Sequence, residues 1–366
     1  MSLNVQFFPS RTVAFYMARI FVVRCLAVLV ALVLVLQALD LLGESGKILA
    51  QPGNGDAELW RYVSLRLPQL IARFLPFSVL LGTLITLVTL NQHSEVISMK
   101  AAGVSAHQII APLVVASLAI AAVTFVFQER VVTRSAAALR VWEAVDYGRI
   151  PPEQNVINNV WVKHGDDLIR AAQVFGKGDA ARLRNVVIYD RSGGTLVGMI
   201  QASEGRRVGD AWRLTGVRRF DLTNGQVQRL SSLDVAKGVT ADQFTMANVY
   251  ADEQTFLQLR RSIEELKVAG RPTVTLTADL WHKLSSPLSA LLMPLLGAVA
   301  AFGLARSGQL LLRAILGMAL GFAYFVIDNF SLAMGNLGAY PPILAAWAPF
   351  ALFLLVGEAV LIRTEE

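Results

Sequence analysis

The sequence predicts an α-helical membrane protein with an inserted all-β domain: three membrane spans, a β domain and three further spans. Of its 366 residues, 54% are hydrophobic and 16% are charged, whereas soluble domains carry about 25% charged residues. Uncharged apolar runs long enough to cross a bilayer occur in both outer parts of the chain. Between them, hydropathy falls for roughly 150 residues that alternate between apolar and polar positions, which is typical of strands.

The first three predicted spans make up a membrane domain of residues 1–127. The first is centred on residues 25–39, and Arg24 at its start is able to reach the headgroup region with its side chain. The second begins near Pro68 and includes the uncharged run 74–90. The third covers residues 108–127. Each run is long enough to span the hydrocarbon layer as a helix.

Residues 91–103, between the second and third spans, are short, polar and favourable to helix. Ser94 is placed to cap a first turn, Glu95 suits the positive end of the helix dipole, and Gly103 is placed to end the helix in a left-handed conformation. At about 100° per residue, one helix face carries four side chains: Glu95, Ser98, Met99 and Ala102. Such a face suits a soluble partner, and a plain connector between two spans is the alternative.

Residues 128–278 are predicted to form a β domain with flanking helices. Residues 129–144 continue the third span as a helix, and residues 253–269 form a helix that leads back. The predicted strands are 160–163, 168–174, 186–190, 195–202, 212–217 and 226–233. Their number and spacing favour a β-sandwich or an open barrel, whose inner face is able to hold acyl chains. Candidate groove residues, each also a plain core candidate, are Val160, Val162, Ile169, Val187 and Ile200.

Residues 279–366 are predicted to hold spans four to six, at 284–304, 309–327 and 343–362. Lys and Arg are more frequent in the termini, the 91–103 segment and the 306–313 turn than on the opposite side outside the β domain. Because cytoplasmic loops carry the excess of basic residues, we expect both termini and the 91–103 segment inside and the β domain outside.

The sequence offers no candidate catalytic or metal site. Its histidines are scattered without metal-ligand spacing, and no GxxxxGK[ST] loop occurs, so we expect neither an enzyme nor a cofactor in this chain. The net charge of +6 is not gathered into a basic run with interleaved aromatics, which argues against nucleic-acid binding. Cys25 is the single cysteine, so an intrachain disulfide is impossible.

Ionisable residues near the ends of the spans are the candidate binding groups. Asp40 and Asp328 lie near predicted outer ends, and Glu358 lies near an inner end. Four arginines at or just beyond the outer ends are candidates for an anionic lipid headgroup, since guanidinium binds phosphate well: Arg66, Arg73, Arg134 and Arg140. A solvated helix face is the alternative for these charges.

Motifs along the whole chain resemble the LptF/LptG family of lipopolysaccharide export permeases, the LptG branch more than the LptF branch. The resemblance is carried by Ser94-Glu95-x-x-x-Met99-x-Ala101-x-Gly103, Leu75-Pro76, Leu81-Gly82, Trp161-x-Lys163-x-Gly165, Trp281-x-Lys283-x-x-x-Pro287-Leu288, Asp328 and Pro341-Pro342-Ile343. Each motif alone is weak, and their joint order is what is specific.

The resemblance implies a permease subunit of an ABC transporter in the inner membrane of a Gram-negative bacterium, with a periplasmic β-jellyroll. It implies partners: an LptF-like permease as heterodimer, an LptB-like ATPase dimer that binds ATP and Mg, and LptC-like and LptA-like jellyroll proteins. It also implies lipopolysaccharide as substrate and residues 94–103 as the coupling helix that meets the ATPase. The residues of this segment that the resemblance assigns to ATPase coupling are Glu95, Ser98, Met99 and Gly103.

The sequence departs from the LptG pattern just after the first span. Gly43, Glu44 and Gln37 stand where the family has lysines, whereas Arg140 matches a family arginine. Two other functions stay open: an envelope scaffold or assembly factor that transports nothing, and a secondary transporter, for which Pro287 and Pro294 would break a helix. Within the leading interpretation, an LptF identity is the alternative.

Overall fold

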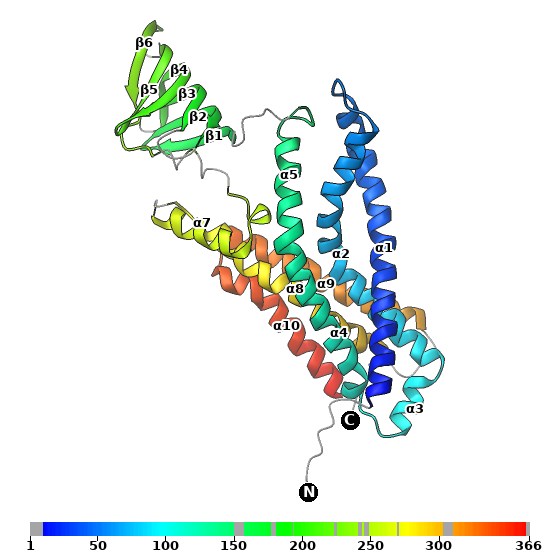
Figure 1. The fold of residues 1–366 in the computed structure, drawn as a ribbon. Helices are drawn as coiled ribbons and strands as arrows, with labels where there is room; N and C mark the ends of the chain where they lie inside the picture. Colours follow the sequence, from blue (N-terminus) through cyan, green and yellow to red (C-terminus); the bar gives the residue numbers. More distant parts are fainter. Residues whose placement is uncertain are drawn as a thin grey trace. The chain divides into compact units, whose positions relative to one another are not determined.

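The structure is a computed structural model that describes residues 10–149, 157–176, 181–192, 194–222, 225–240, 244, 249–268, 271–302 and 310–363. The chain divides into two compact units. The first comprises Met1–Gly148, Ala251–Lys267 and Arg271–Glu366, and it is helical. The second comprises Arg149–Tyr250 with Val268–Gly270 and contains the β-sheet (Figure 1).

The first half of the helical unit is a long hairpin followed by a helix that continues beyond its apolar part. Helices α1 (Arg11–Leu49) and α2 (Asp56–Gln92) pack against each other. The short helix α3 (Glu95–Ala101) follows, and then α4 (Ala106–Phe127). The predicted continuation of the third span is confirmed: α4 runs through the π-helical turn η1 (Gln128–Val132) into α5 (Thr133–Glu143).

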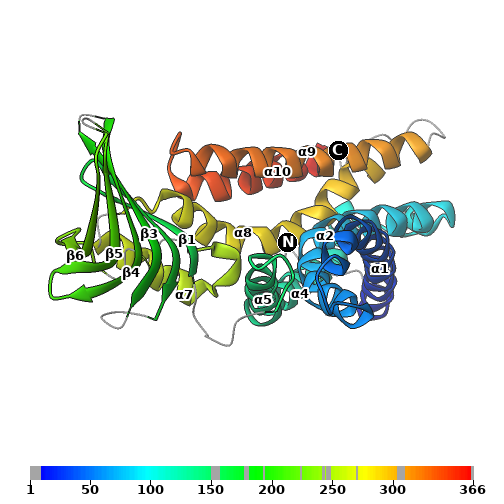
Figure 2. The same cartoon turned by 90° about the horizontal axis from the view of Figure 1, so that it is seen from above.

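The second half of this unit returns from the β domain through the short turn η3 (Ala251–Glu253) and helix α7 (Phe256–Val268). Three long helices follow, and α8 packs on both α9 and α10 (Figure 2). They are α8 (Val274–Phe302), α9 (Leu310–Asn336) and α10 (Pro342–Arg363).

Five helices in the described residues are long and apolar enough to cross a membrane. They are Arg11–Leu49, Asp56–Gln92, Ala106–Glu143, Ile315–Asn336 and Pro342–Arg363. The predicted fourth span, residues 284–304, coincides with most of α8, and its last two residues lie outside the described part of the chain. The helices extend well past the apolar runs. Arg24, for example, donates to the Ile85 carbonyl oxygen of α2 at 3.0 Å.

The β unit contains one six-stranded antiparallel sheet in which each strand pairs with the next. Its strands are β1 (Ile157–His164), β2 (Asp167–Phe175), β3 (Arg182–Ser192), β4 (Thr195–Val208), β5 (Ala211–Asp221) and β6 (Val227–Val235). All six predicted strands exist, and the sheet is strongly curved (Figure 2). The second layer of strands that a sandwich requires is not among the described residues.

One face of the sheet is covered by an apolar cluster. Trp212 is 1% exposed, donates through Nε1 to the Val239 carbonyl oxygen at 2.9 Å, and meets Phe244 edge-on. Four of the predicted groove residues are buried in this cluster: Val160, Val162, Ile169 and Ile200. The assignment of Val187 to the same face is wrong. Val186 and Ile188 are buried there, and alternation along a strand turns Val187 to the other face.

Helices α1 and α2 pack closely where Gly82 faces Cys25. A Cβ built on Gly82 would lie 2.4 Å from Cys25 Sγ and 2.9 Å from the Cys25 backbone nitrogen. Cys25 is 3% exposed, so the thiol fills the space that the missing side chain leaves. Glycine at this position lets the two helices pack closely, as small residues do between membrane helices.

This contact predicts that Gly82→Ala destabilises the protein by about 1–3 kcal/mol, because the added methyl group overpacks the crossing. The midpoint of thermal unfolding in a fixed detergent should fall, and Cys25 should react faster with a maleimide. Gly43→Ala is the matched control, since nothing lies within 4 Å of a Cβ on that α1 glycine. Equal midpoints and equal thiol reactivity in the two variants would contradict the close crossing.

Candidate functional site: an exposed short helix and a charged pocket

The segment between α2 and α4 turns sharply at both ends of α3. Ser94 adopts φ 59° and ψ 14°, and its side chain makes no capping hydrogen bond, so the predicted Ser94 cap is wrong. Its carbonyl oxygen instead accepts from the Ser98 amide and the Ser98 hydroxyl, both at 2.9 Å. A left-handed residue is needed because α2 and α3 meet within two residues and must change direction. The predicted left-handed Gly103 is confirmed, with φ 84°.

One side of α3 packs against the bundle and the other is open. Val96 is 5% exposed, and both Val96 and Met99 pack with the main apolar cluster of the helical unit. Met99 therefore turns partly inward, away from the predicted outer face, because apolar side chains at i and i+3 follow one helix face. Ser98 and Ala102 are exposed, and Ile97 is 60% exposed. The open surface of α3 is consequently a mixture of small, polar and apolar groups beside one carboxylate.

Glu95 lies at the start of α3 and is half-buried. Its Oε1 accepts a hydrogen bond of 3.3 Å from the Tyr16 hydroxyl of α1. The α3 segment is thus attached to α2 and α4 by the chain, and to α1 by a side-chain contact. Any displacement of α3 would act on all three helices.

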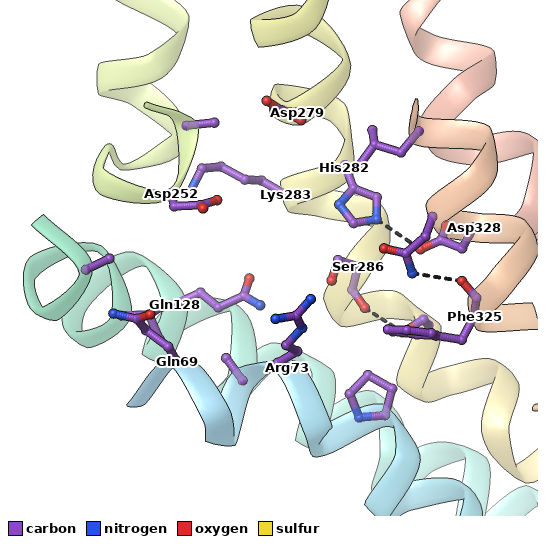
Figure 3. Close-up of a pocket in the computed structure, with 18 of the residues that line it drawn as sticks. Gln69, Arg73, Gln128, Asp252, Asp279, His282, Lys283, Ser286, Phe325 and Asp328 are labelled. Atoms are coloured by element: carbon purple, nitrogen blue, oxygen red, sulfur yellow. Dashed lines mark hydrogen bonds and ion pairs between the residues drawn. The ribbon is translucent and has the colours of Figure 1, made fainter. Parts of the chain in front are cut away.

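A pocket of about 550 Å³ lies within the helical unit, bounded by α2, η1, α5, η3, α8 and α9 (Figure 3). Its lining includes four Lys or Arg side chains and four Asp or Glu side chains. These are Arg66, Arg73, Arg140 and Lys283, and Glu143, Asp252, Asp279 and Asp328. The pocket is therefore strongly charged and close to neutral overall.

Half of these eight charged residues pair with a side chain of another helix or turn. Nε2 of His282 in α8 lies 3.0 Å from Asp328 Oδ2 in α9. Lys283 Nζ lies 3.9 Å from Glu129 Oε1, and the other oxygen of Glu129 accepts from the Phe256 amide at 2.8 Å. Glu129 thereby joins η1 to α8 and to the first turn of α7.

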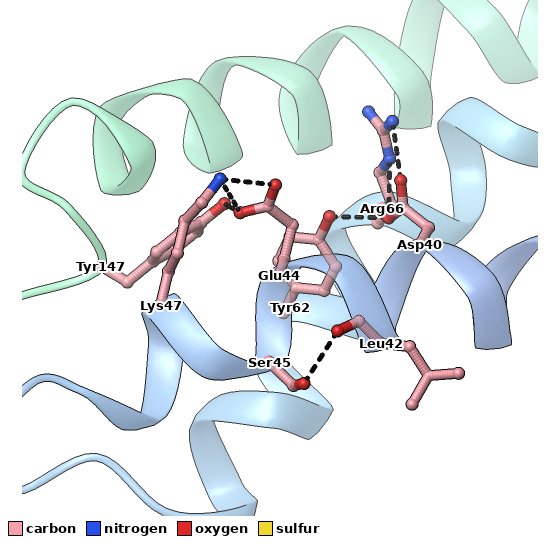
Figure 4. A network of polar contacts seen from close by, with 8 residues as sticks. All are labelled: Asp40, Leu42, Glu44, Ser45, Lys47, Tyr62, Arg66 and Tyr147. Carbon is pink, nitrogen blue, oxygen red and sulfur yellow. Dashed lines mark hydrogen bonds and ion pairs between the residues drawn. The ribbon is translucent and has the colours of Figure 1, made fainter.

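Two of the four predicted headgroup arginines are held by carboxylates. Arg66 donates to both oxygens of Asp40, at 3.2 and 3.1 Å, and Asp40 also accepts from the Tyr62 hydroxyl at 2.6 Å (Figure 4). Arg140 pairs with Glu253 of η3. Burial raises the pKa of the Glu253 carboxyl, and the charge of Arg140 opposes that rise.

The other two arginines are available. Arg73 and Arg134 are exposed, and neither makes a hydrogen bond or ion pair with any residue in the described part of the chain. Arg73 lines the pocket, whereas Arg134 does not. A guanidinium without an internal partner is free to bind a ligand, because no existing pair has to be broken.

Glu44 and Gln37, two of the positions that depart from the family's lysine pattern, lie in different environments. Glu44 pairs with Lys47 at 2.9 Å and accepts from the Tyr147 hydroxyl at 3.0 Å (Figure 4). Gln37 is 7% exposed, and neither its side-chain nitrogen nor its oxygen has a hydrogen-bond partner among the described residues. Helix α1 therefore presents an acceptor and a buried amide at these two positions.

The sequence marks Asp328 as a candidate binding group but does not indicate that His282 lies beside it. The two residues are 46 positions apart and meet only because α8 packs along α9. The signal present in the sequence was an ionisable residue in each of two apolar helices, which favours mutual pairing inside a membrane. Nothing in the local pattern specified which helices would be neighbours.

Comparison with known proteins identifies the family. A family model described as "Lipopolysaccharide export system permease LptF/LptG" matches residues 15–363. The lipopolysaccharide export system permease protein LptG of Escherichia coli (strain K12) is 25% identical over 312 residues, which cover 82% of this chain and 84% of the relative. The LptG protein of Haemophilus influenzae is 24% identical over 315 residues, covering 83% and 86%.

The Asp40 network predicts that Arg66→Gln destabilises the protein by about 1–3 kcal/mol, because a half-buried carboxylate loses its bidentate donor. The thermal unfolding midpoint should fall at constant detergent and pH. Lys47→Gln is the control, since its ion pair with Glu44 is largely exposed and such pairs contribute about 1 kcal/mol or less. If Arg66→Gln cost no more than Lys47→Gln, Arg66 would not be a structural residue.

Proposed function

This chain belongs to the LptF/LptG family of lipopolysaccharide export permeases, and we propose that it is an LptG-like subunit of an ATP-driven transporter. In this role it extracts lipopolysaccharide from the inner membrane and delivers it to a periplasmic bridge towards the outer membrane. The family and the five apolar helices indicate a multi-pass protein of the inner membrane. The relatives named above, which are LptG proteins, support LptG over LptF.

We propose six membrane spans, with α8 as the fourth. The proposed domains are residues 1–127, 128–278 and 279–366, with the middle one a periplasmic jellyroll-like domain and both chain ends cytoplasmic. The distribution of Lys and Arg supports this orientation. ATP and Mg would bind to a separate LptB-like ATPase dimer. An LptF-like permease would complete the membrane pair, and LptC-like and LptA-like proteins would continue the periplasmic path.

The geometry of α3 is the observation that carries the coupling role. It is a short helix between two long ones, with Val96 packed inward and a carboxylate beside its exposed surface. A partner that binds this surface would move α2 and α4 directly, because short connections join α3 to both helices and only two residues separate it from α2. Closure of two ATPase subunits would then be transmitted as rigid movement of these helices around the lipid.

Among the proposed headgroup arginines, Arg73 and Arg134 have no partner in the part of the chain that the structure describes, and Arg73 lines a pocket. Arg66 and Arg140 reach the same region, but each would have to share its existing carboxylate with the lipid. We therefore assign the first contact with a lipid phosphate to Arg73. Arg66 and Arg140 act mainly by holding α2 and α5 in place.

Substitution of Glu95 tests the coupling role. Glu95→Ala and Glu95→Lys should either prevent copurification of the ATPase or lower lipopolysaccharide release per ATP by about tenfold or more, as loss of a charge-assisted contact implies. The measurement is pull-down from membranes followed by ATPase and lipid-release assays in proteoliposomes.

Two matched variants separate the partner contact from internal effects. Tyr16→Phe removes the internal hydrogen bond of Glu95 and keeps its charge, and Gln92→Ala changes an exposed residue just before α3. Both should keep coupled transport. Normal transport by Glu95→Ala and Glu95→Lys would rule out the coupling role of this residue.

A further inference from the structure

We propose that the pocket between α2, α5, α8 and α9 is a bipolar headgroup site, with Arg73 binding a phosphate and Asp328 binding hydroxyl or ammonium donors of the same lipid. This inference rests on the proposed function and names the chemistry that this subunit selects. It adds a carboxylate acceptor to the arginine contacts of the proposed lipid site.

The cationic pole is Arg73 of α2. Figure 3 shows its guanidinium pointing into the pocket between Gln128 and Ser286. The other three cations of the lining already have carboxylate neighbours: Arg66 has Asp40, Arg140 has Glu253 and Lys283 has Glu129. Arg73 is consequently the lining cation that can offer a phosphate two parallel N–H donors without losing a partner.

The anionic pole is Asp328 of α9. Its residue surface is 7% exposed, and its Oδ2 takes the hydrogen bond from His282. Its Oδ1 has no hydrogen-bond partner in the described structure. A buried carboxylate oxygen left unpaired is costly, and an ionised carboxylate is able only to accept. A donor arriving with the ligand would satisfy this oxygen.

The two poles together restrict the ligand class. A hydrocarbon chain would leave both Arg73 and Asp328 without partners. A bare polyanion would bring like charge towards Asp328 and Asp279, which lie on the α8 and α9 walls. A headgroup that carries a phosphate next to hydroxyl or ammonium groups pairs with both walls.

The size of the pocket agrees with a headgroup. A volume of about 550 Å³ is within the range of about 300–1,000 Å³ for sites of small molecules. The pocket is too small to hold several acyl chains in addition to a headgroup. Two lipids supply the required chemistry: the phosphorylated glucosamine headgroup of lipopolysaccharide, and the phosphoethanolamine headgroup of a phospholipid.

The test measures lipid binding to the full-length chain, purified with the subunits that accompany it, by native mass spectrometry after delipidation. The probes are lipid A, phosphatidylethanolamine, phosphatidylcholine and phosphatidic acid. The variants are Arg73→Gln and Asp328→Asn. Arg134→Gln is the matched control, because Arg134 also has no partner among the described residues but lies outside the pocket.

Arg73→Gln should weaken every phosphate-bearing lipid that binds the pocket by about tenfold, as expected for a lost charged hydrogen-bond pair. Asp328→Asn should weaken lipid A or phosphatidylethanolamine by about fivefold. It should not weaken phosphatidic acid, because that lipid brings no donor besides its phosphate and the substitution removes a like charge. Arg134→Gln should leave all affinities unchanged.

A comparison on the unmodified protein guards against misfolding of Asp328→Asn. Phosphatidylcholine has no N–H donors, so it should bind more weakly than phosphatidylethanolamine if the phospholipid is the ligand. Sensitivity of lipid A to both substitutions supports the proposal with lipopolysaccharide as the source, and the same sensitivity of phosphatidylethanolamine supports it with a phospholipid.

Two results would overturn the proposal. The first is that Arg73→Gln changes the affinity for none of the lipids. The second is that Asp328→Asn leaves the affinity for lipid A unchanged while the unmodified protein binds phosphatidylcholine and phosphatidylethanolamine equally well. Copurification of the ATPase and coupled lipid release are measured separately, and neither of these two results predicts their loss. Failure of the bipolar site is therefore distinguishable from failure of the proposed transport function.

Discussion

The requirement that charges inside an apolar bundle be paired governs the helical unit. Asp40 with Arg66 joins α1 to α2, His282 with Asp328 joins α8 to α9, and Glu129 with Lys283 joins η1 to α8. Because a buried ion without a partner costs several kcal/mol, each pair fixes which helices are neighbours and how they align along their axes. Arg73 and one oxygen of Asp328 have no partner among the described residues, and both line the same pocket. Exceptions to such a rule are expected at functional sites.

Glu129 has a second consequence for the fold. It sits in a π-helical turn, where one extra residue per turn redirects side chains, and such turns are frequent at functional sites. Its carboxylate caps the first turn of α7, and Arg140 nearby pairs with Glu253. The segment that leaves the helical bundle and the segment that returns to it are therefore held together by two contacts. They move as one element unless both contacts break.

Hydropathy and period-2 patterns in the sequence were sufficient for the apolar helices and the six strands, because those signals are local and repeat over many residues. They failed where one residue decides a direction. Val187 was assigned to the wrong face of β3, and Ser94 adopts a left-handed backbone in place of capping α3. Met99 shares the predicted outer face of α3 but packs inward because the bundle lies beside it. The pairing of His282 with Asp328 depends on helix neighbours that a single sequence does not specify.

Helix α2 connects the two proposed functional regions mechanically. It carries Arg73 and Pro76 in the pocket lining and ends at Gln92, and two residues separate it from α3. At about 1.5 Å per residue, the nineteen residues from Arg73 to Gln92 span roughly 28 Å of helix. Pro76 lacks the amide hydrogen that would bond the Ala72 carbonyl oxygen, so the helix is weakest in bending beside the pocket. A force applied at α3 would therefore be carried along the stiff part of α2 and appear as a change of angle where Arg73 meets its ligand.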